Sequence, residues 1–225
     1  MAEITPIPLA ELTTLRTGAA PERMLDAATT EELVDTLREV WSRNDEWFVL
    51  GGGSNLFVGD EPFDGTVIRI LTTGIERLPS PHAGRARLRV QAGHNWDELV
   101  AYTVEQRLAG IEAMSGIPGT VGAAPVQNVG AYGQEIQETL VQVVPASELG
   151  LGFRTSVLKH HYGGAPIRRA VILSVTLDLA EVDEAGREIS GEQLRRALGI
   201  RRAERCGRRP GDRDDGGRRE RDPAR

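Results

Sequence analysis

The feature that most constrains the fold of this chain is a neutral, glycine-rich segment at residues 116–133. It reads GIPGTVGAAPVQNVGAYG and holds five glycines and two prolines but no charged side chain. A solvent-exposed loop usually carries more charge, and a packed helix or strand carries fewer glycines. We therefore expect the segment to bring bare main chain against a flat ring system or a diphosphate. Ordinary structural turns are the alternative.

A second glycine-rich segment, GGGSNLF at residues 51–57, follows an apolar run typical of a buried strand. Successive main-chain N–H groups in such a turn can form a concave nest for phosphate oxygens. A Rossmann fingerprint would require a helix directly after the glycines, and a P-loop would require Gly-Lys-Ser/Thr; the sequence offers neither. Taken alone, this segment is consistent with a phosphate loop or a tight turn. Two such loops joined by short strands favour one extended dinucleotide threaded between two lobes.

Hydrophobic periodicity predicts helices and strands that alternate without a strict βαβ rhythm. Capping boxes at Thr29 and Ser190 and an N-cap at Asn95 mark the starts of three helices. The helices are expected at residues 29–44, 95–110 and 190–199, and the strands at 46–50, 66–70, 86–93, 139–144 and 169–179. The first helix is expected to bury Leu33, Val34, Leu37, Val40 and Trp41, and the second Trp96, Leu99, Val100, Thr103 and Val104.

This pattern favours an α+β chain of two small lobes. The first lobe is expected at residues 1–70 and the second at 71–182, followed by a linker helix at 183–200. Residues 201–225 contain no large apolar residue and are expected to be disordered. Their ten arginines and six acidic residues give a charge of +4. The abrupt change of composition favours an out-of-frame or truncated C-terminus over a genuine solvated tail or a nucleic-acid-binding tail.

Composition bears on the cellular compartment of the protein and on the classes of partner that it binds. The formal net charge of −6 argues against a nucleic-acid partner, and the single cysteine, Cys206, fits a reducing compartment. The N-terminus lacks the basic and apolar regions of a signal peptide, and no apolar run reaches the ~18 residues of a membrane span. We therefore expect a cytoplasmic protein without a membrane partner. A monomer is also expected.

Several motifs together carry a family resemblance. They are VLGGGSNLFV at residues 49–58, FDGTVIRI at 63–70, the run from QAGHNWDELV to GAYGQEI at 91–136, and GFRTSVLKHHY at 152–162. Over residues 12–199 the chain resembles the UDP-N-acetylenolpyruvoylglucosamine reductase family. The resemblance implies an FAD-binding fold of the vanillyl-alcohol-oxidase (PCMH) type. It also implies NADPH-dependent, FAD-mediated reduction of a UDP-sugar, UDP-N-acetylglucosamine enolpyruvate, to UDP-N-acetylmuramate for peptidoglycan synthesis.

The resemblance also implies roles for individual residues. The FAD diphosphate would lie on the main-chain amides of Gly51, Gly52, Gly53, Ser54, Asn55 and Leu56. The flavin would be lined by Ile117, Pro118, Gly119, Thr120, Val121, Gly122 and Ala123, together with Asn128, Gly130 and Ala131. Arg154 would hold the substrate carboxylate and stabilise the negative charge that develops during reduction. Tyr132 and Gln127 are further lining candidates. No metal site is expected, because His160 and His161 lack acidic or cysteine partners at ligand spacing.

The chain departs from the family pattern after residue 201. Members of the family carry a third, substrate-binding domain there, which supplies a serine and a glutamate for protonation of the substrate. No residue of this chain can be assigned those roles. We therefore expect an FAD-dependent reductase that is impaired in this chain, because losing acid–base help typically costs ~10²–10⁴-fold in rate. A non-catalytic FAD-binding module and another FAD-dependent oxidoreductase of the same fold are the alternatives.

Overall fold

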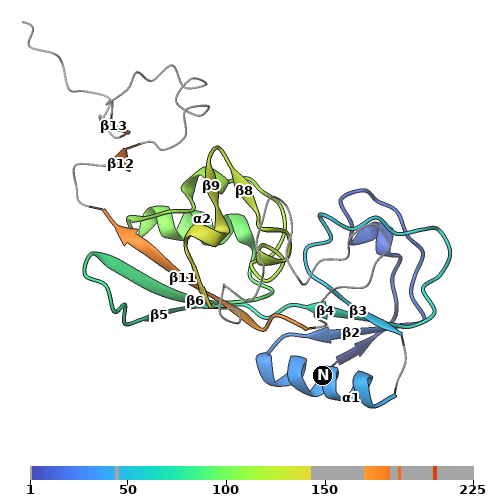
Figure 1. Cartoon of the computed structure of the whole chain (residues 1–225). Coiled ribbons are helices and arrows are strands. Elements are labelled where there is room, and N and C mark those ends of the chain that lie inside the picture. Colours follow the sequence, from blue (N-terminus) through green and yellow to red (C-terminus); the bar gives the residue numbers. More distant parts are fainter. Residues whose placement is uncertain (1, 44–45, 143–169, 183–186, 189–204, 207–225) are drawn as a thin grey trace, which may run out of the picture.

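Two β-sheets form the framework of the molecule (Figure 1). The structure is a computed structural model that describes residues 2–43, 46–142, 170–182, 187–188 and 205–206. The strands of the first sheet lie between residues 2 and 70, and those of the second lie between residues 75 and 181. Arg154 and the motif around it lie outside the described residues.

The first sheet has four strands in the order β1-β2-β4-β3. These strands are β1 (Ala2–Ile4), β2 (Arg23–Ala27), β3 (Trp47–Leu50) and β4 (Thr66–Ile70). β2 and β3 run parallel to β4, and β1 is antiparallel to β2 at the edge. Residues on both faces of β2 and β4 are buried in hydrophobic clusters. Because both faces of β4 are buried, its sequence is a nearly continuous apolar run rather than an alternation of apolar and polar residues.

Helix α1 (Thr30–Arg43) packs against β2 and β4 and begins with the predicted capping box. The Glu32 amide donates to the Thr29 hydroxyl at 3.1 Å, and Glu32 Oε2 accepts from the Thr29 amide at 3.3 Å. The predicted burial of Trp41 is wrong, since this side chain is 52% exposed. Thr36 lies on the inner face instead, and Trp41 lies about 100° round the helix from the buried Val40.

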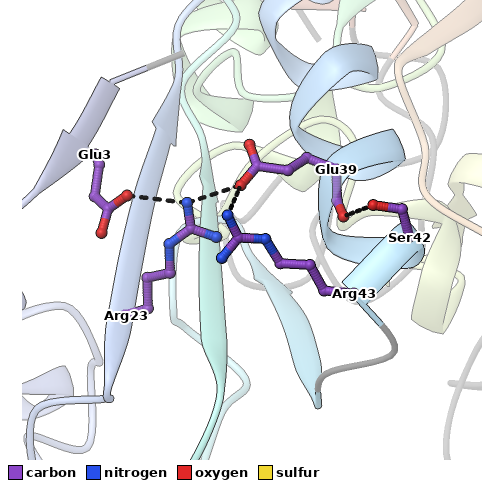
Figure 2. Close-up of polar contacts among 5 residues, drawn as sticks. All are labelled: Glu3, Arg23, Glu39, Ser42 and Arg43. Carbon is purple, nitrogen blue, oxygen red and sulfur yellow. Dashed lines mark hydrogen bonds and ion pairs between the residues drawn. The ribbon is translucent and has the colours of Figure 1, made fainter.

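Arg23 on β2 ties the edge strand β1 to helix α1 (Figure 2). Its guanidinium donates to Glu3 on β1 and to Glu39 on α1, each at 2.9 Å. Arg43, one helical turn further on, reaches the same Glu39 carboxylate at 3.0 Å. The hydrogen bond from Arg23 and its charge hold the pKa of Glu3 below its ordinary value. The network therefore anchors an edge strand that is three residues long.

The second sheet is antiparallel throughout. Its strands follow the order β10 (Leu140–Gln142), β11 (Ser174–Glu181), β6 (Arg85–Gln91) and β5 (Ile75–Leu78), and β7 (Leu108–Ala109) also pairs with β11. Along β6, buried Ala86, Leu88 and Val90 alternate with arginines on the opposite face. This alternation matches the predicted half-buried strand.

Helix α2 (Trp96–Glu105) packs beside β7 and the 3-10 helix η2 (Glu112–Met114). Asn95 caps it as predicted, and its side chain accepts from the amides of residues 97 and 98 at 2.9 and 3.1 Å. The predicted helix end at residue 110 is wrong. Arg107 adopts φ +58°, which ends the helical path, and β7 then joins β11. Val104 is 49% exposed rather than buried, since Thr103 takes the inward position of that turn.

One hydrophobic core extends across both sheets. Its buried residues include Leu25 and Ile68 of the first sheet and Leu88 and Leu177 of the second. Trp96 of α2 belongs to the same cluster. The predicted lobes are therefore joined by continuous packing. Their boundary near residue 71 falls between the two sheets and stays a prediction.

Shorter elements complete the described chain. They are η1 (Leu9–Glu11), η3 (Pro125–Gln127), η4 (Ile136–Glu138) and the hairpin of β8 (Gly130–Ala131) and β9 (Gln134–Glu135). Within the segments predicted as linker helix and disordered tail, β12 (Arg187–Glu188) pairs with β13 (Arg205–Cys206). The rest of both segments lies outside the described residues. Among the described helices, none has the length and apolar character that a membrane crossing needs.

Candidate cofactor-binding site

The first loop, defined as residues 51–56, leaves the carboxyl end of β3 and is held from behind by the N-terminal segment. Gly53 adopts φ +63°, and a Cβ on it would overlap the Leu12 carbonyl oxygen. The Gly53 carbonyl accepts a hydrogen bond from the Thr14 amide at 3.2 Å. In the described stretch from residue 54 to residue 65, no helix follows the glycines, which agrees with the exclusion of a Rossmann loop. Gly53 is buried, whereas Gly51 and Gly52 are exposed.

The second loop, defined as residues 116–123, is fastened to the segment that connects β6 to α2. Thr120 and Asn95 form an isolated antiparallel bridge. The Val121 amide donates to the His94 carbonyl at 2.9 Å, and the Gly122 amide donates to the Ala92 carbonyl at 2.8 Å. A Cβ on Gly122 would lie 2.6 Å from the Ala92 Cβ, so this glycine permits the close approach. Val121 and Gly122 are buried and therefore position the loop.

The start of the second loop has support that the sequence analysis missed. The Asp97 carboxylate accepts from the Gly116 amide at 2.6 Å and from the Ser115 hydroxyl at 3.0 Å. The Trp96 indole N–H donates to the Met114 carbonyl at 3.1 Å. Asp97 and Trp96 read in the sequence as ordinary first-turn helix residues. Their partners lie 18 or 19 residues further along the chain, so no local pattern reveals the contacts.

The two loops touch each other, as the hypothesis of one shared dinucleotide requires. The Ser54 hydroxyl donates to the Pro118 carbonyl at 3.1 Å. A Cβ added to Gly52 would lie 2.8 Å from the Gly119 Cα. A Cβ added to Gly51 would lie 2.6 Å from the Thr120 hydroxyl oxygen. The glycines thus allow main chain of one loop to lie directly against main chain of the other.

Free main-chain donors gather at this contact. The amides of residues 51–56 donate no hydrogen bond to any described residue, and the same holds for the amides of Gly119 and Thr120. Gly53 is the buried residue among them, and buried N–H groups normally have partners in folded proteins. Unpartnered amides on two adjacent, uncharged glycine loops suit the oxygens of a diphosphate. The residues present therefore fit the diphosphate of a dinucleotide.

Asn128 shapes the turn that follows η3. It adopts φ +45° and is 1% exposed. Its side-chain amide donates to Glu135 at 2.7 Å, and its side-chain oxygen accepts from the Gln137 amide at 3.3 Å. These contacts give Asn128 a role in holding the chain around residues 130 and 131. Its direct contact with a flavin stays a prediction.

The β8–β9 hairpin borders a pocket of about 330 Å³. Its tip is formed by Tyr132 at φ +50° and Gly133 at φ +86°, and a positive φ is uncommon for a bulky aromatic residue. The Tyr132 side chain is 48% exposed at this tip. The pocket is lined by Asn128, Gly130, Ala131, Tyr132, Gly133, Gln134, Glu135 and Glu138. Three residues predicted to line a flavin therefore lie together at one pocket, and Arg154 is outside the described residues.

Comparison with known proteins relates the chain to flavoproteins. Residues 21–155 match the family described as FAD binding domain. The chain is 54% identical over 188 residues to UDP-N-acetylenolpyruvoylglucosamine reductase of Leifsonia xyli subsp. xyli, and the match covers 78% of this chain and 48% of the relative. The same-named protein of Thermobifida fusca is 41% identical, with coverage of 86% and 56%. The chain therefore spans about half the length of these relatives.

Solved structures give the same relation at the level of the fold. The UDP-N-acetylenolpyruvylglucosamine reductase of Thermus caldophilus matches with a TM-score of 0.61 and 27% identity, covering 88% of this chain and 68% of that one. Cholesterol oxidase of B. sterolicum matches with a TM-score of 0.54 and 13% identity, covering 80% of this chain and 38% of that one. These matches confirm the predicted fold and the resemblance of the motifs. The chain belongs to the FAD binding domain family.

Proposed function

We propose that this chain binds FAD between its two glycine loops. The FAD diphosphate lies on the amides of the first loop and of Gly119 and Thr120. The flavin ring lies on the second loop and extends toward Gly130 and Ala131. The observation that carries this proposal is the contact between two uncharged loops, at which the amides of residues 51–56, Gly119 and Thr120 have no partner in the described chain. Placing bare amides rather than charged side chains at the site lets main chain approach the cofactor closely.

We further propose that the bound cofactor serves the reduction of UDP-N-acetylglucosamine enolpyruvate to UDP-N-acetylmuramate, with NADPH as reductant. The support is the similarity to reductases of that name and the motif GFRTSVLKHHY that contains Arg154. FAD supplies the hydride chemistry when it is bound. The chain's own loops orient it, and Arg154 binds the substrate carboxylate as a guanidinium fork. No described residue is assigned to protonation of the substrate.

The proposal is tested by titrating the purified chain with FAD and following flavin fluorescence and absorbance. Saturable quenching with one FAD per chain is the expected result. A preparation that is colourless and leaves flavin fluorescence unchanged would overturn the FAD site. NADPH oxidation is then measured with and without UDP-N-acetylglucosamine enolpyruvate. FAD binding without substrate-dependent oxidation would leave the cofactor site standing and would favour a non-catalytic FAD-binding module.

A further inference from the structure

The two glycine loops are fastened to different parts of the molecule. The first loop is held by the N-terminal segment through the Thr14 amide and the Gly53 carbonyl. The second loop is held by residues next to α2 through the bridge between Thr120 and Asn95. The shared hydrophobic core brings both loops to the same region, since Val121 belongs to the cluster that Val49 of β3 packs against. The contacts that join one loop directly to the other act on their separation in addition.

The direct side-chain link described between the loops is the hydrogen bond from Ser54 to Pro118. It spans 64 residues of sequence, and its donor and acceptor are 3.1 Å apart. Beside it, Gly52 faces Gly119 so closely that a Cβ on Gly52 would lie 2.8 Å from the Gly119 Cα. The glycine contact sets how near the loops can come. The hydrogen bond from the Ser54 hydroxyl opposes their separation.

We propose that Ser54 is a positioning residue that locks the two loops at one separation before FAD binds. This inference rests on the proposed FAD site. Binding is strengthened when the groups that contact a ligand are already held in place, because less ordering is needed on association. With the Ser54 link in place, the free amides of both loops face the diphosphate as one surface. Without it, FAD itself must draw the loops together.

The chemistry of the hydroxyl separates this role from a direct contact. A serine has one O–H to donate, and Ser54 donates it to the Pro118 carbonyl. The hydroxyl oxygen then has only lone pairs left, and these would repel the oxygens of a diphosphate. In this arrangement Ser54 acts on FAD through the second loop rather than through its own side chain. If Ser54 instead donated its hydroxyl to a phosphate oxygen of FAD, replacing Ser54 would not change the loops in the absence of FAD.

The test compares Ser54→Ala with Ser80→Ala. Ser80 is also half-buried, and its hydroxyl also donates one hydrogen bond, to Asp178 at 3.0 Å; it accepts another from the His82 amide at 3.2 Å, and it lies after β5, outside both loops. Amide hydrogen exchange of residues 116–123 is measured without FAD, and FAD affinity is measured by fluorescence titration. Ser54→Ala is expected to speed exchange in the second loop and to weaken FAD binding roughly two- to tenfold, the value of one ordinary hydrogen bond. Ser80→Ala is expected to change neither.

Each other outcome has a defined meaning. Weaker FAD binding with unchanged exchange in the cofactor-free chain would overturn the proposal and make Ser54 a direct ligand. Faster exchange with unchanged FAD affinity would also overturn it, because the link between the loops would then not contribute to FAD binding. A wild-type chain that shows no FAD binding removes the proposed function and this inference together. Ser54→Thr keeps the hydroxyl and is expected to retain exchange and affinity; losses equal to those of Ser54→Ala would contradict a role for the hydroxyl.

Discussion

Gly52 and Gly119 face each other where the two loops meet, and their missing side chains are what let the loops touch. Gly52 is exposed, so its replacement does not disturb the buried core. Its added Cβ would nevertheless meet main chain rather than a flexible side chain. Main chain cannot rotate aside as a side chain tip can. The effect of such a replacement should therefore appear in cofactor binding more than in stability.

We predict that Gly52→Ala weakens FAD binding by about 1–3 kcal/mol, or roughly 5- to 150-fold, the cost of forcing one extra methyl group into close packing. The matched control is Gly59→Ala, because a Cβ on Gly59 has no atom within 4 Å. Isothermal titration with FAD measures both variants. Equal affinities for Gly52→Ala and Gly59→Ala would show that the contact between the loops does not shape the site.

At the scale of the elements, the buried carboxylate of Asp178 links strand β11 to strand β6 on the sheet face that carries the arginines. Asp178 on β11 is 6% exposed and accepts from Arg85 at 2.7 Å and from Ser80 at 3.0 Å. Burial raises the pKa of Asp178, but the hydrogen bonds from Arg85 and Ser80 and the charges of Arg85 and Arg87 outweigh burial. The net result is a pKa below the ordinary value of 3.8. Asp178 is therefore ionised in the folded chain at neutral pH.

A lowered pKa makes the contribution of Asp178 to stability depend on pH in one direction. The folded chain holds the proton on Asp178 less tightly than the unfolded chain does, so this contribution is complete above about pH 4 and is lost as the pH falls through the folded pKa. We predict that Asp178→Asn lowers the free energy of unfolding by about 1–3 kcal/mol at pH 7. The difference from the wild type should shrink below pH 4, as measured by urea denaturation.

Asp35→Asn is the control for this prediction. Asp35 also pairs with an arginine, Arg38, at 3.3 Å, but both side chains are more than two-thirds exposed, at 72% and 73%. Exposed pairs contribute about 0–1 kcal/mol, so this variant should differ little from the wild type at any pH. A gap between Asp178→Asn and the wild type that stays constant from pH 7 to pH 3 would contradict the assignment.

Local patterns predicted the elements better than their ends and their contacts. The capping residues Thr29 and Asn95 fixed two helix starts correctly, because a cap acts on amides two or three residues away. The end of α2 was wrong, because it depends on β7 pairing with β11 some 70 residues later. Strands β1 and β2 were missed. β1 is an edge strand of three residues with no strong apolar pattern, and β2 contains the charged residues Arg23 and Asp26.

The same distinction holds for the candidate site. The glycine composition of both loops pointed to close main-chain approach, and the structure brings the loops into contact. The hydrogen bond from Ser54 to Pro118 could not be predicted, since its partners are 64 residues apart. The support from Asp97 was hidden for a similar reason. Long-range contacts of this kind depend on tertiary packing, which no local periodicity encodes.

At the scale of the whole molecule, the continuous hydrophobic core makes the two sheets depend on each other. Leu88 of β6 and Leu25 of β2 belong to one cluster and are both fully buried. Removing volume from one sheet therefore withdraws contacts from a core that both share. Two lobes with separate cores would instead respond independently.

We predict that Leu88→Ala lowers the stability of both sheets together, by about 2–5 kcal/mol. Native-state hydrogen exchange of amides in β2 and β6 measures the free energy of opening of each sheet in the same experiment. Leu15→Ala, at a side chain that is 58% exposed, is the control and should cost less than about 0.5 kcal/mol. A loss confined to β6, with β2 unchanged, would show that the sheets unfold separately.

The central claim is that main-chain amides of the two loops hold FAD. The most direct measurement is a backbone amide NMR titration of the ¹⁵N-labelled chain with FAD. The account predicts that the largest shifts fall on the amides of residues 51–56 and of Gly119 and Thr120, in the direction of stronger hydrogen bonding. Saturable FAD binding with these amide signals unmoved, and the largest shifts elsewhere, would contradict it.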